Sequence, residues 1–483
     1  MLNNYLLKYK NMPIQIKASI WFLVCSFLQK GISFITTPIF TRVLSTSEYG
    51  QYNVFISWMS IITVFVSLNL YYGVYVRGLV KYQDDRKHFT SSLQGLMLSL
   101  VFLWTIIYFV FRAYINEIIG LTTNQMLLML TMIWTTGVFN FWATEKRVEL
   151  KYKSLVAITL LLSLAKPITS LIFIRLSNDK VTARILGLVL VELIVCSVLF
   201  IKQMYIGKQF FSKRYWKHAL LFNIPLIPHY LSTSILNSSD RIMIDKMVGS
   251  SEAGIYSLAY SVSMIMTILN TSLMQTIEPW MYQKIKDNKV EDISKVAYPC
   301  FAIVAVINIA LIAMAPEVIR LFAPIEYYEA IYVIPPVAMS VFFMFSYTFF
   351  AVFEFYFEKT KQIAFATSFG AVLNIVLNFI CIKLFGYVAA GYTTLICFCV
   401  YTFMHYYFMQ KICKEKLDGR KPYNIKIYLL IASIFVIMGF LFQITYINFL
   451  VRYAIILIAI VMILIKKKVI LEEVNRIINI KKK

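Results

Sequence analysis

Charged residues are scarce in this sequence, and no long polar linker separates its apolar segments. Lys, Arg, Asp and Glu make up 15% of the 483 residues and hydrophobic residues make up 60%. Soluble globular chains carry roughly 25% charged and 45–50% apolar residues, and a soluble chain of this length would divide into domains joined by polar linkers. The composition therefore excludes an ordinary soluble protein and predicts a polytopic integral membrane protein.

A cysteine framework and a cleavable secretory signal are also missing. The seven cysteines lie mostly within apolar runs and have no zinc-type spacing, so we expect them to act as small hydrophobic residues and to bind no metal. The first apolar run begins near Ala18 and continues past Pro38 without a small-residue cleavage site. We therefore expect this run to form the first membrane helix.

Common enzyme motifs are absent as well. The sequence contains no glycine-rich nucleotide loop of the Walker or Rossmann type and no H-E-x-x-H motif. No extramembrane segment is large enough to house a glycosyltransferase site. We expect no enzymatic activity and no cofactor, and we expect a proton or sodium gradient rather than ATP to supply energy.

The net charge of +23 is compatible with nucleic-acid binding, but that function needs a basic face on a folded soluble surface. Here the basic residues lie in short connections between apolar runs. Membrane topology explains them better, because cytoplasmic loops carry an excess of Lys and Arg. No nucleic-acid partner is expected.

The apolar runs have the length of membrane helices. A bilayer core about 30 Å thick requires about twenty apolar helical residues per crossing, and non-helical backbone cannot face lipid. The predicted fold class is therefore an all-α polytopic membrane protein of about fourteen transmembrane helices. These are expected at residues 18–40, 51–72, 91–111, 124–144, 154–176, 185–205, 219–239, 253–275, 296–319, 330–353, 363–383, 388–409, 426–447 and 449–465.

The distribution of basic residues predicts the orientation of these helices. If the N-terminus is cytoplasmic, most of the 47 Lys and Arg residues fall in the two tails and in the even-numbered connections. This is the arrangement that the positive-inside rule requires. Both termini are therefore expected in the cytoplasm of a bacterial cell, with the helices in its cytoplasmic membrane. Only Lys30 and Lys166 remain unassigned, each near the middle of its predicted helix.

The chain contains an internal repeat. SEYGQYNVFISWMSII begins at Ser47 and SEAGIYSLAYSVSMIM at Ser251, and four identities recur at one constant offset: Ser47, Glu48, Gly50 and Tyr52 match Ser251, Glu252, Gly254 and Tyr256. Both copies join the first helix of a half to the second. EKRVELKYKSLVAITLL after the fourth helix also resembles FEKTKQIAFATSFGAVL after the tenth. Turn chemistry is the alternative explanation, because Glu and Gly commonly cap helix ends.

The repeat predicts two six-helix bundles related by a parallel pseudo-repeat, with two helices appended. Architectures of this kind place a substrate cavity between the halves and expose it alternately to each face of the membrane. The predicted boundaries are an N-terminal bundle at 1–205, a cytoplasmic linker at 206–217, a C-terminal bundle at 218–409, a second linker at 410–425, helices 13 and 14 at 426–465, and a basic cytoplasmic tail at 466–483.

Three charged residues stand out well inside predicted helices of the first half: Lys30, Lys166 and Glu192. A charge at the bilayer centre costs at least about 2.5–3.5 kcal/mol and normally faces a cavity or a partner. Lys166 precedes Pro167, and a proline within a helix bends it, often where the helix lines a cavity. We expect the lysines to line a cationic cavity for an anionic substrate; structural pairing with Glu192 or carbonyl groups, and snorkelling, are the alternatives. Glu192 is either a site of ion coupling or a counter-ion.

The second half carries neutral polar residues instead. Asn374 and Asn378 are four residues apart and therefore share a helix face. Hydrogen bonding between helices is the ordinary role of such residues, and contacts with sugar hydroxyls are the more specific alternative. The candidates for sugar contact are Asn237, Asn270, Asn374 and Asn378; Asn223, His229, Ser239, Gln275 and His405 are similar in kind.

Charged residues also lie beside each copy of the repeat, at the outer ends of helices. Asp240, Arg241 and Asp245 follow the seventh helix, and Arg42 ends the first. An outer gate of salt bridges and plain helix capping explain them equally well.

Three stretches resemble the polysaccharide-transport family of the multidrug/oligosaccharidyl-lipid/polysaccharide flippase superfamily, the group of Wzx-type O-antigen and capsule repeat-unit flippases. They are TPIFTRVLSTSEYGQYNVF, NSSDRIMIDKMVGSSEAGIYSLAYSVSMI and NIVLNFICIKLFGYVAAGYTT. The resemblance spans nearly the whole chain, and its most specific part is S-D-R-x-x-I followed by E-x-G-x-Y.

The resemblance implies a pair of six-helix bundles that moves an undecaprenyl-pyrophosphate-linked oligosaccharide to the outer leaflet by ion-driven alternating access. It implies that Lys30 and Lys166 belong to a cationic lumen, which neutralises pyrophosphate, and that Glu192 is a coupling acid. Glu354 and His405 have no clear counterpart in the family, and their roles stay open. The implied partners are the lipid-linked substrate, membrane lipids, and the polymerase and chain-length regulator of the pathway; a monomer is expected.

Three rivals remain. A lipid II flippase or a multidrug and cation antiporter would share the fold, although an antiporter would prefer acidic residues in its cavity. A polysaccharide polymerase or ligase would usually carry a long external loop, which is not seen here. A structural scaffold would tolerate neutralisation of the midplane lysines.

Overall fold

The computed structural model describes residues 12–465, and every regular element in this range is a helix. Eleven of these helices are long and apolar enough to cross a membrane. The predicted all-α polytopic membrane fold is therefore confirmed. The predicted basic tail at 466–483 lies outside the described residues.

The contacts divide the chain into two compact units. Unit 1 runs to Ser238 and unit 2 begins at Ser239, so the chain passes from one to the other within a single helix. The division of the chain into two six-helix bundles at 206–217 stays a prediction.

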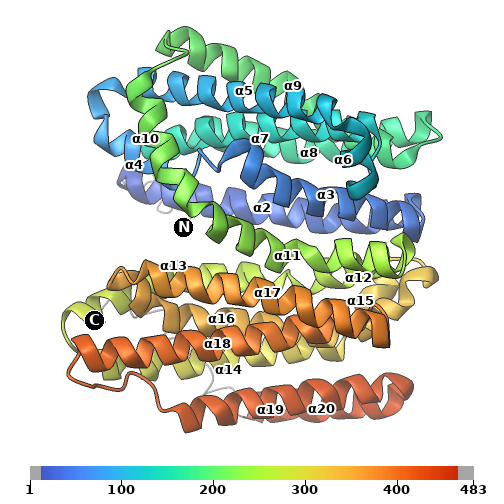
Figure 1. Ribbon diagram of the computed structural model, residues 1–483. Coiled ribbons are helices and arrows are strands. Elements are labelled where there is room, and N and C mark those ends of the chain that lie inside the picture. The colour runs from blue at the N-terminus through green and yellow to red at the C-terminus, as the bar shows by residue number, and fades with distance from the viewer. Residues whose placement is uncertain (1–11, 466–483) are drawn as a thin grey trace. The chain divides into compact units, whose positions relative to one another are not determined.

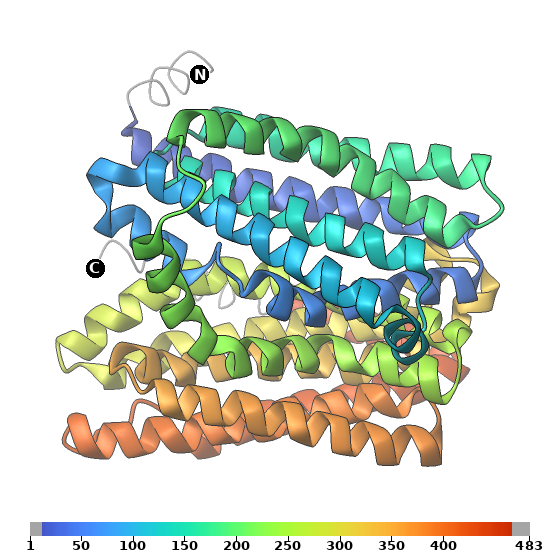
Figure 2. The same ribbon diagram turned by 45° about the horizontal axis from the view of Figure 1, so that its top comes forward.

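Unit 1 consists of long helices with shorter helices between them (Figure 1). Within it, α8 packs along α9, α9 also packs against α7, and α2 packs against α8; the two ribbon views show these helices side by side (Figure 2). Its elements are α2 (Ile14–Val43), α3 (Thr46–Ser67), α4 (Gly73–Lys81), η1 (Gln83–Asp85), α5 (Arg86–Val110), α6 (Arg112–Ile119), α7 (Thr123–Val148), α8 (Tyr152–Leu176), α9 (Lys180–Gly207), α10 (Lys213–Asn223), η2 (Ile224–Leu226) and the first part of α11 (Ile227–Met247).

Unit 2 is built around α16, which packs against α18, α14, α13, α12 and α19 and is the most deeply buried of the eleven candidate spans. Its elements are the last part of α11, α12 (Ser250–Ser263), α13 (Met266–Lys286), η3 (Val290–Ile293), α14 (Ser294–Ala313), α15 (Ala315–Phe322), η4 (Ile325–Tyr332), α16 (Ile334–Tyr356), α17 (Thr360–Phe385), α18 (Ala389–Lys416), α19 (Ile425–Ile444), η5 (Thr445–Ile447) and α20 (Phe449–Ile465).

Three of the fourteen expected spans are not among the eleven: those at 51–72, 388–409 and 449–465. They correspond to α3, α18 and α20. α20 is only seventeen residues long, and α3 and α18 carry many hydroxyl and amide side chains. Helices that pack on other helices over much of their surface need a less continuous apolar surface than helices surrounded by lipid.

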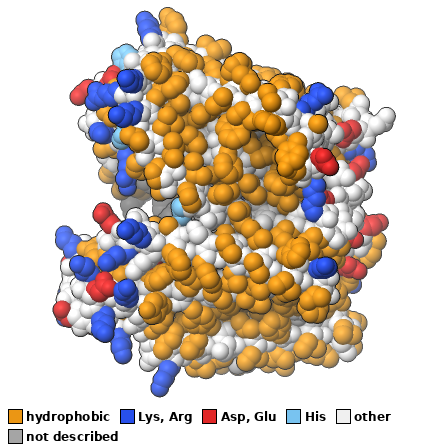
Figure 3. Space-filling view, in the orientation of Figure 1, with side chains coloured by type: hydrophobic (Ala, Val, Ile, Leu, Met, Phe, Trp, Pro, Cys, Tyr) orange, Lys and Arg blue, Asp and Glu red, His pale blue; other side chains and the backbone are white. Residues whose placement is uncertain are grey.

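Hydrophobic side chains cover the flank of each unit, and Lys and Arg side chains gather at the ends of the helices (Figure 3). This is the distribution expected of a membrane-spanning protein, in which the apolar band contacts acyl chains and charges remain at the interfaces. The chain is a multi-pass membrane protein.

Two differences from the predicted helix boundaries bear on the site, and only the first has a signal in the sequence. The expected helix at 219–239 is divided at η2, which contains Pro225, and its second part continues to Met247. The expected helix at 253–275 is two helices, α12 and α13, which meet at Met264 and Ile265. Asp240, Arg241 and Asp245 therefore lie within the last turns of α11 rather than beyond its end.

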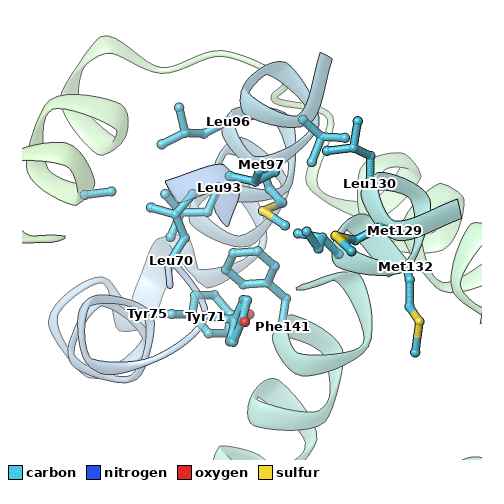
Figure 4. Close-up of a cluster of buried hydrophobic side chains, with 14 of the residues drawn as sticks. Leu70, Tyr71, Tyr75, Leu93, Leu96, Met97, Met129, Leu130, Met132 and Phe141 are labelled. Atoms are coloured by element: carbon cyan, nitrogen blue, oxygen red, sulfur yellow. The ribbon is translucent and has the colours of Figure 1, made fainter. Parts of the chain in front are cut away.

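Leucine, aromatic and methionine side chains form a buried cluster in unit 1 (Figure 4). The rings of Tyr75 and Phe141 meet edge to face with centroids 4.7 Å apart, and the hydroxyl of Tyr75 lies 2.9 Å from Thr90 Oγ1. Aromatic pairs of this kind contribute about 0.5–1.5 kcal/mol beyond their burial. Because lipid is as apolar as these side chains, such packing, rather than exclusion of water, holds the helices together.

The last two helices are integral to unit 2. α19 packs against α14 and α16, and the hydroxyl of Tyr446 donates to the carbonyl oxygen of Ile312 at 2.6 Å. Arg452 on α20 forms an ion pair with Glu317 on α15. The structure thus gives these helices a packing role, which the sequence left open.

Candidate functional site

Lys166, Glu192 and Thr135 form a buried group in unit 1, called here the unit 1 polar centre. Lys166 Nζ forms an ion pair with Glu192 Oε1, and Thr135 Oγ1 donates to Glu192 Oε2 at 2.8 Å. The side chain of Glu192 is 7% exposed and that of Lys166 27%. The three residues come from α8, α9 and α7, so the centre joins three helices of the unit.

The local sequence explains why these two charges meet. On α8, the exposed residues Leu161, Leu164, Ile168 and Ile172 lie on the helix face opposite Lys166, so the lysine points into the unit. α9 approaches α8 closely at Gly187, where an added Cβ would lie 2.5 Å from Ser170 Cα. Thr169 Oγ1 also donates to the carbonyl oxygen of Gly187 at 2.8 Å. This close approach, about one helical turn away, brings Lys166 and Glu192 within reach of each other.

Of the alternatives for Lys166 and Glu192, the geometry favours structural pairing, with Glu192 as the counter-ion. A buried carboxylate beside an ammonium group has its charge offset locally. The remaining exposure of Lys166 leaves it partly accessible. Its role as a cavity cation, and the role of Glu192 in ion coupling, stay predictions.

Lys30 on α2 is exposed and makes no hydrogen bond or ion pair with the described residues of the chain. Ser26, Lys30, Ser33 and Thr37 follow one another at spacings of three and four residues, so they form one polar stripe along α2. A stripe of this composition is costly against lipid. It is suited to water or to an anionic ligand.

A second buried group lies in unit 2, around Asp240, and is called here the unit 2 polar centre. Asp240 is 2% exposed and accepts hydrogen bonds from three neutral donors: Asn378 Nδ2 at 2.5 Å, the Tyr256 hydroxyl at 2.8 Å and Thr394 Oγ1 at 2.9 Å. Asn374 Oδ1 accepts from Asn378 Nδ2 at 3.2 Å and from Ser239 Oγ at 2.8 Å. The centre therefore joins α11, α12, α17 and α18.

The four asparagines proposed for sugar contact differ in position. Asn374 and Asn378 belong to the unit 2 polar centre and are buried. Asn270 is also buried, and its Nδ2 donates to the carbonyl oxygen of Val341 at 3.2 Å. Only Asn237 is exposed. Hydrogen bonding between helices, the ordinary alternative, fits the three buried residues, and sugar contact stays a prediction.

The charges proposed for an outer gate each have a local partner. Arg42 donates to the carbonyl oxygen of Pro38 at 2.8 Å, one turn earlier in α2, which is helix capping. The Arg241 guanidinium lies 4.1 Å from the centroid of the Tyr260 ring, and Asp245 Oδ1 accepts from Ser250 Oγ at 2.5 Å. Asp240 is too buried to act as an exposed gate charge.

The two copies of the repeated motif have related local roles. Each begins a helix: Glu48 completes a capping box with Ser45 at the start of α3, and Glu252 lies in the first turn of α12. The tyrosine of each copy meets a polar side chain of its own unit. Arg184 lies 3.5 Å from the centroid of the Tyr52 ring, and Tyr256 binds Asp240.

Several residues of these centres could not be found from the sequence. Thr135 and Thr394 are ordinary helical residues in the sequence, and Tyr256 stood out only as part of the repeated motif; the fold brings them to Glu192 and Asp240. Glu354 and His405 were visible as polar residues in apolar helices, and they prove to be a buried pair. Within residues 12–465, no three His, Cys, Asp or Glu side chains are grouped to hold a metal ion.

Comparison with known protein families gives two matches. The family model described as polysaccharide biosynthesis protein matches residues 16–285, which is more than half of the chain. The model described as MatE matches residues 225–380. A comparison with curated proteins gave no match.

Solved structures show the same fold. The structure titled lipid II flippase MurJ, in an inward closed conformation, has a TM-score of 0.65 and 14% identity over 90% of this chain and 100% of that chain. An inward-facing multidrug resistance MATE family transporter of the MOP superfamily has a TM-score of 0.61 and 15% identity over 80% and 95%. The Vibrio cholerae MATE transporter VcmN has a TM-score of 0.57 and 10% identity over 83% and 97%.

At these identities the structures are evidence for the fold alone, and they are transporters and flippases rather than enzymes. The family match covers the first eight predicted helices, including both copies of the repeated motif. Together these findings confirm the resemblance that the sequence carries: the chain belongs to the polysaccharide biosynthesis protein family of the multidrug/oligosaccharidyl-lipid/polysaccharide flippase superfamily.

Proposed function

We propose that this protein moves undecaprenyl-pyrophosphate-linked oligosaccharide repeat units across the bacterial cytoplasmic membrane by alternating access, for assembly of O-antigen, capsule or exopolysaccharide. The family match and the flippase fold support transport of a lipid-linked sugar. Both termini are cytoplasmic in this proposal. The protein acts as a monomer and passes its cargo to the polymerase and chain-length regulator of the same pathway.

Lys30 is the observation that carries the proposal. It is an exposed cation with no hydrogen-bond or ion-pair partner among the described residues, on a polar stripe of a helix that also exposes Ile, Leu and Phe side chains. A pyrophosphate group loses its hydration when it leaves the membrane surface, and an unpaired ammonium group compensates part of that cost. Lys166 contributes less, because Glu192 already offsets its charge.

Ion coupling is assigned to the unit 2 polar centre rather than to Glu192. Asp240 is a buried acid whose three hydrogen-bond donors are neutral, so a proton or a sodium ion would relieve the cost of its burial. Glu192 already has that relief from Lys166. On this reasoning, Asp240 binds the cation whose gradient drives the cycle.

Substitution of Lys30 tests the proposal in cells. Lys30→Ala is expected to abolish surface polysaccharide while the protein accumulates normally in the membrane, because the exposed side chain makes no hydrogen bond or ion pair with the described residues. Lys30→Arg keeps the charge and should retain most of the product. Lys153→Ala removes another exposed lysine, near the start of α8, and serves as the matched control. Normal polysaccharide in Lys30→Ala would contradict the proposal.

A lipid II flippase is the second candidate, because the structure titled lipid II flippase MurJ matches the chain over 90% of its length. The two cargoes are distinguished by depletion of the protein. Loss of surface polysaccharide with normal growth supports the repeat-unit cargo. Arrest of cell-wall synthesis, together with rescue of a strain depleted of its lipid II flippase, would assign lipid II instead.

A further inference from the structure

A buried acid and a buried imidazole meet in unit 2, apart from the unit 2 polar centre. Glu354 Oε1 on α16 lies 2.5 Å from His405 Nδ1 on α18. The side chains are 0% and 1% exposed. Glu354 Oε2 and His405 Nε2 have no hydrogen-bond partner among the described residues. Such orphan polar atoms are rare in native proteins, and each requires an explanation.

Two tyrosines enclose the imidazole. The Tyr347 ring on α16 stacks on it with centroids 5.4 Å apart, and the Tyr401 ring on α18 meets it edge to face at 4.4 Å. Aromatic rings stabilise a cation that lies against their faces. The structure therefore places the imidazole between the Glu354 carboxyl group and two rings that can accommodate a cation.

The titratable groups in contact with the imidazole, besides Glu354, are the tyrosines Tyr347 and Tyr401. α17 places Thr367 beside Tyr401, and α13 places Tyr282 against Tyr356, close to the end of α16. Among the described residues, His405 is the charged side chain that forms a hydrogen bond or ion pair with Glu354. The proton balance of the pair is therefore set by its own two members.

The number of protons bound by Glu354 and His405 sets the net charge of the buried pair, and therefore the free-energy cost of burying it. With one proton, shared as imidazolium and carboxylate or as two neutral groups, the net charge is zero. When that proton leaves to water, a lone carboxylate remains buried between two helices without a cation, which is costly. The empty site therefore favours any conformation in which α16 and α18 separate enough to let water reach Glu354.

We propose that Glu354 and His405 form a buried proton-binding site in unit 2, whose occupancy stabilises the contact between α16 and α18. The site is distinct from Asp240 and does not depend on the cargo. Glu354 lies two residues before the end of α16, and the Lys359–Glu415 pair marks the same end of α17 and α18. Proton exchange therefore needs only a small opening at one end of the bundle.

Nuclear magnetic resonance of the full chain tests the site directly. The chain has four histidines, so replacement of His88, His218 and His229 by Gln leaves His405 as the only labelled imidazole. The ring signals of His405 are expected to change as the pH is raised, because the pair releases its proton. The midpoint pH of this change is expected to differ in Glu354→Gln. A histidine that stays neutral from about pH 5 to 8, or a transition that is the same in Glu354→Gln, would overturn the proposal.

Thermal unfolding in detergent provides the second test, because a rigid structural contact would not respond to pH. If the native protein binds one proton more than the unfolded protein, stability falls as the pH rises. The folding equilibrium constant then decreases by up to tenfold for each pH unit. The melting temperature of the wild type is expected to fall with rising pH relative to Glu354→Gln and to Ser346→Ala, a buried control on α16. Parallel pH profiles for the wild type and Glu354→Gln would overturn the proposal.

Discussion

Removal of one member of the Lys166–Glu192 pair should destabilise unit 1, whereas removal of both should not. Lys166→Met leaves Glu192, at 7% exposure, with the Thr135 hydroxyl as its only hydrogen-bond partner within residues 12–465. Breaking a buried ion pair in this way costs about 3–5 kcal/mol, and the 27% exposure of Lys166 places the value near the lower end of that range. Glu192→Leu should cost about 1–2 kcal/mol, because the remaining lysine can extend toward water.

The double variant Lys166→Met/Glu192→Leu should lie within about 1 kcal/mol of the wild type, because apolar replacement of a whole buried pair is often neutral. Equilibrium unfolding in mixed micelles would measure the free energies of unfolding of the wild type, the two single variants and the double variant. This double-mutant cycle is expected to give a coupling energy of at least about 2 kcal/mol between the two side chains. A Lys166→Met protein as stable as the wild type would refute the pairing. Surface polysaccharide from strains that carry the same variants distinguishes a structural role of Lys166 from a role in substrate binding. A double variant that is stable but produces no polysaccharide would support the role in substrate binding.

Three further predictions follow from named contacts. Gly187→Ala should destabilise the protein by about 1–3 kcal/mol, because its Cβ would lie 2.5 Å from a backbone atom of α8; Gly31→Ala, with nothing within 4 Å, is the control, and equal melting temperatures would contradict the close approach. Asp240→Asn should remove the dependence of transport on the ion gradient. It should also lower the free energy of unfolding by about 1–3 kcal/mol, because the new amide leaves a buried hydrogen-bond donor unpaired. Transport that still depends on the gradient would exclude Asp240 as the coupling acid. Alkaline phosphatase should be active after Lys180 and inactive after Lys289, and the reverse would overturn the orientation.

The helices were predictable because the bilayer imposes one length and one composition on each crossing. Breaks inside helices were harder to predict. Pro225 marks the division between α10 and α11 in the sequence, but α12 and α13 meet at Met264 and Ile265, where no proline or glycine signals a break.

The partners of buried charges could be predicted only in part. The sequence showed that Lys166 and Glu192 both lay inside helices, so pairing was one of the stated alternatives. It could not choose between pairing and a cavity, because the choice depends on the close approach of α8 and α9 at Gly187. Asp240 was expected at a helix end, and its burial became visible only when α11 was seen to continue to Met247.

The central claim is that the protein flips a lipid-linked oligosaccharide, and transport in reconstituted vesicles tests it most directly. Purified protein would be incorporated into liposomes containing an undecaprenyl-pyrophosphate-linked oligosaccharide, and the fraction of sugar open to a membrane-impermeant oxidant would be followed in time. The proposed function predicts that the wild type makes the inner-leaflet sugar accessible, that an ion gradient accelerates this, and that Lys30→Ala does not support it. Equal accessibility in vesicles with and without the protein, or flipping of lipid II alone, would contradict the claim.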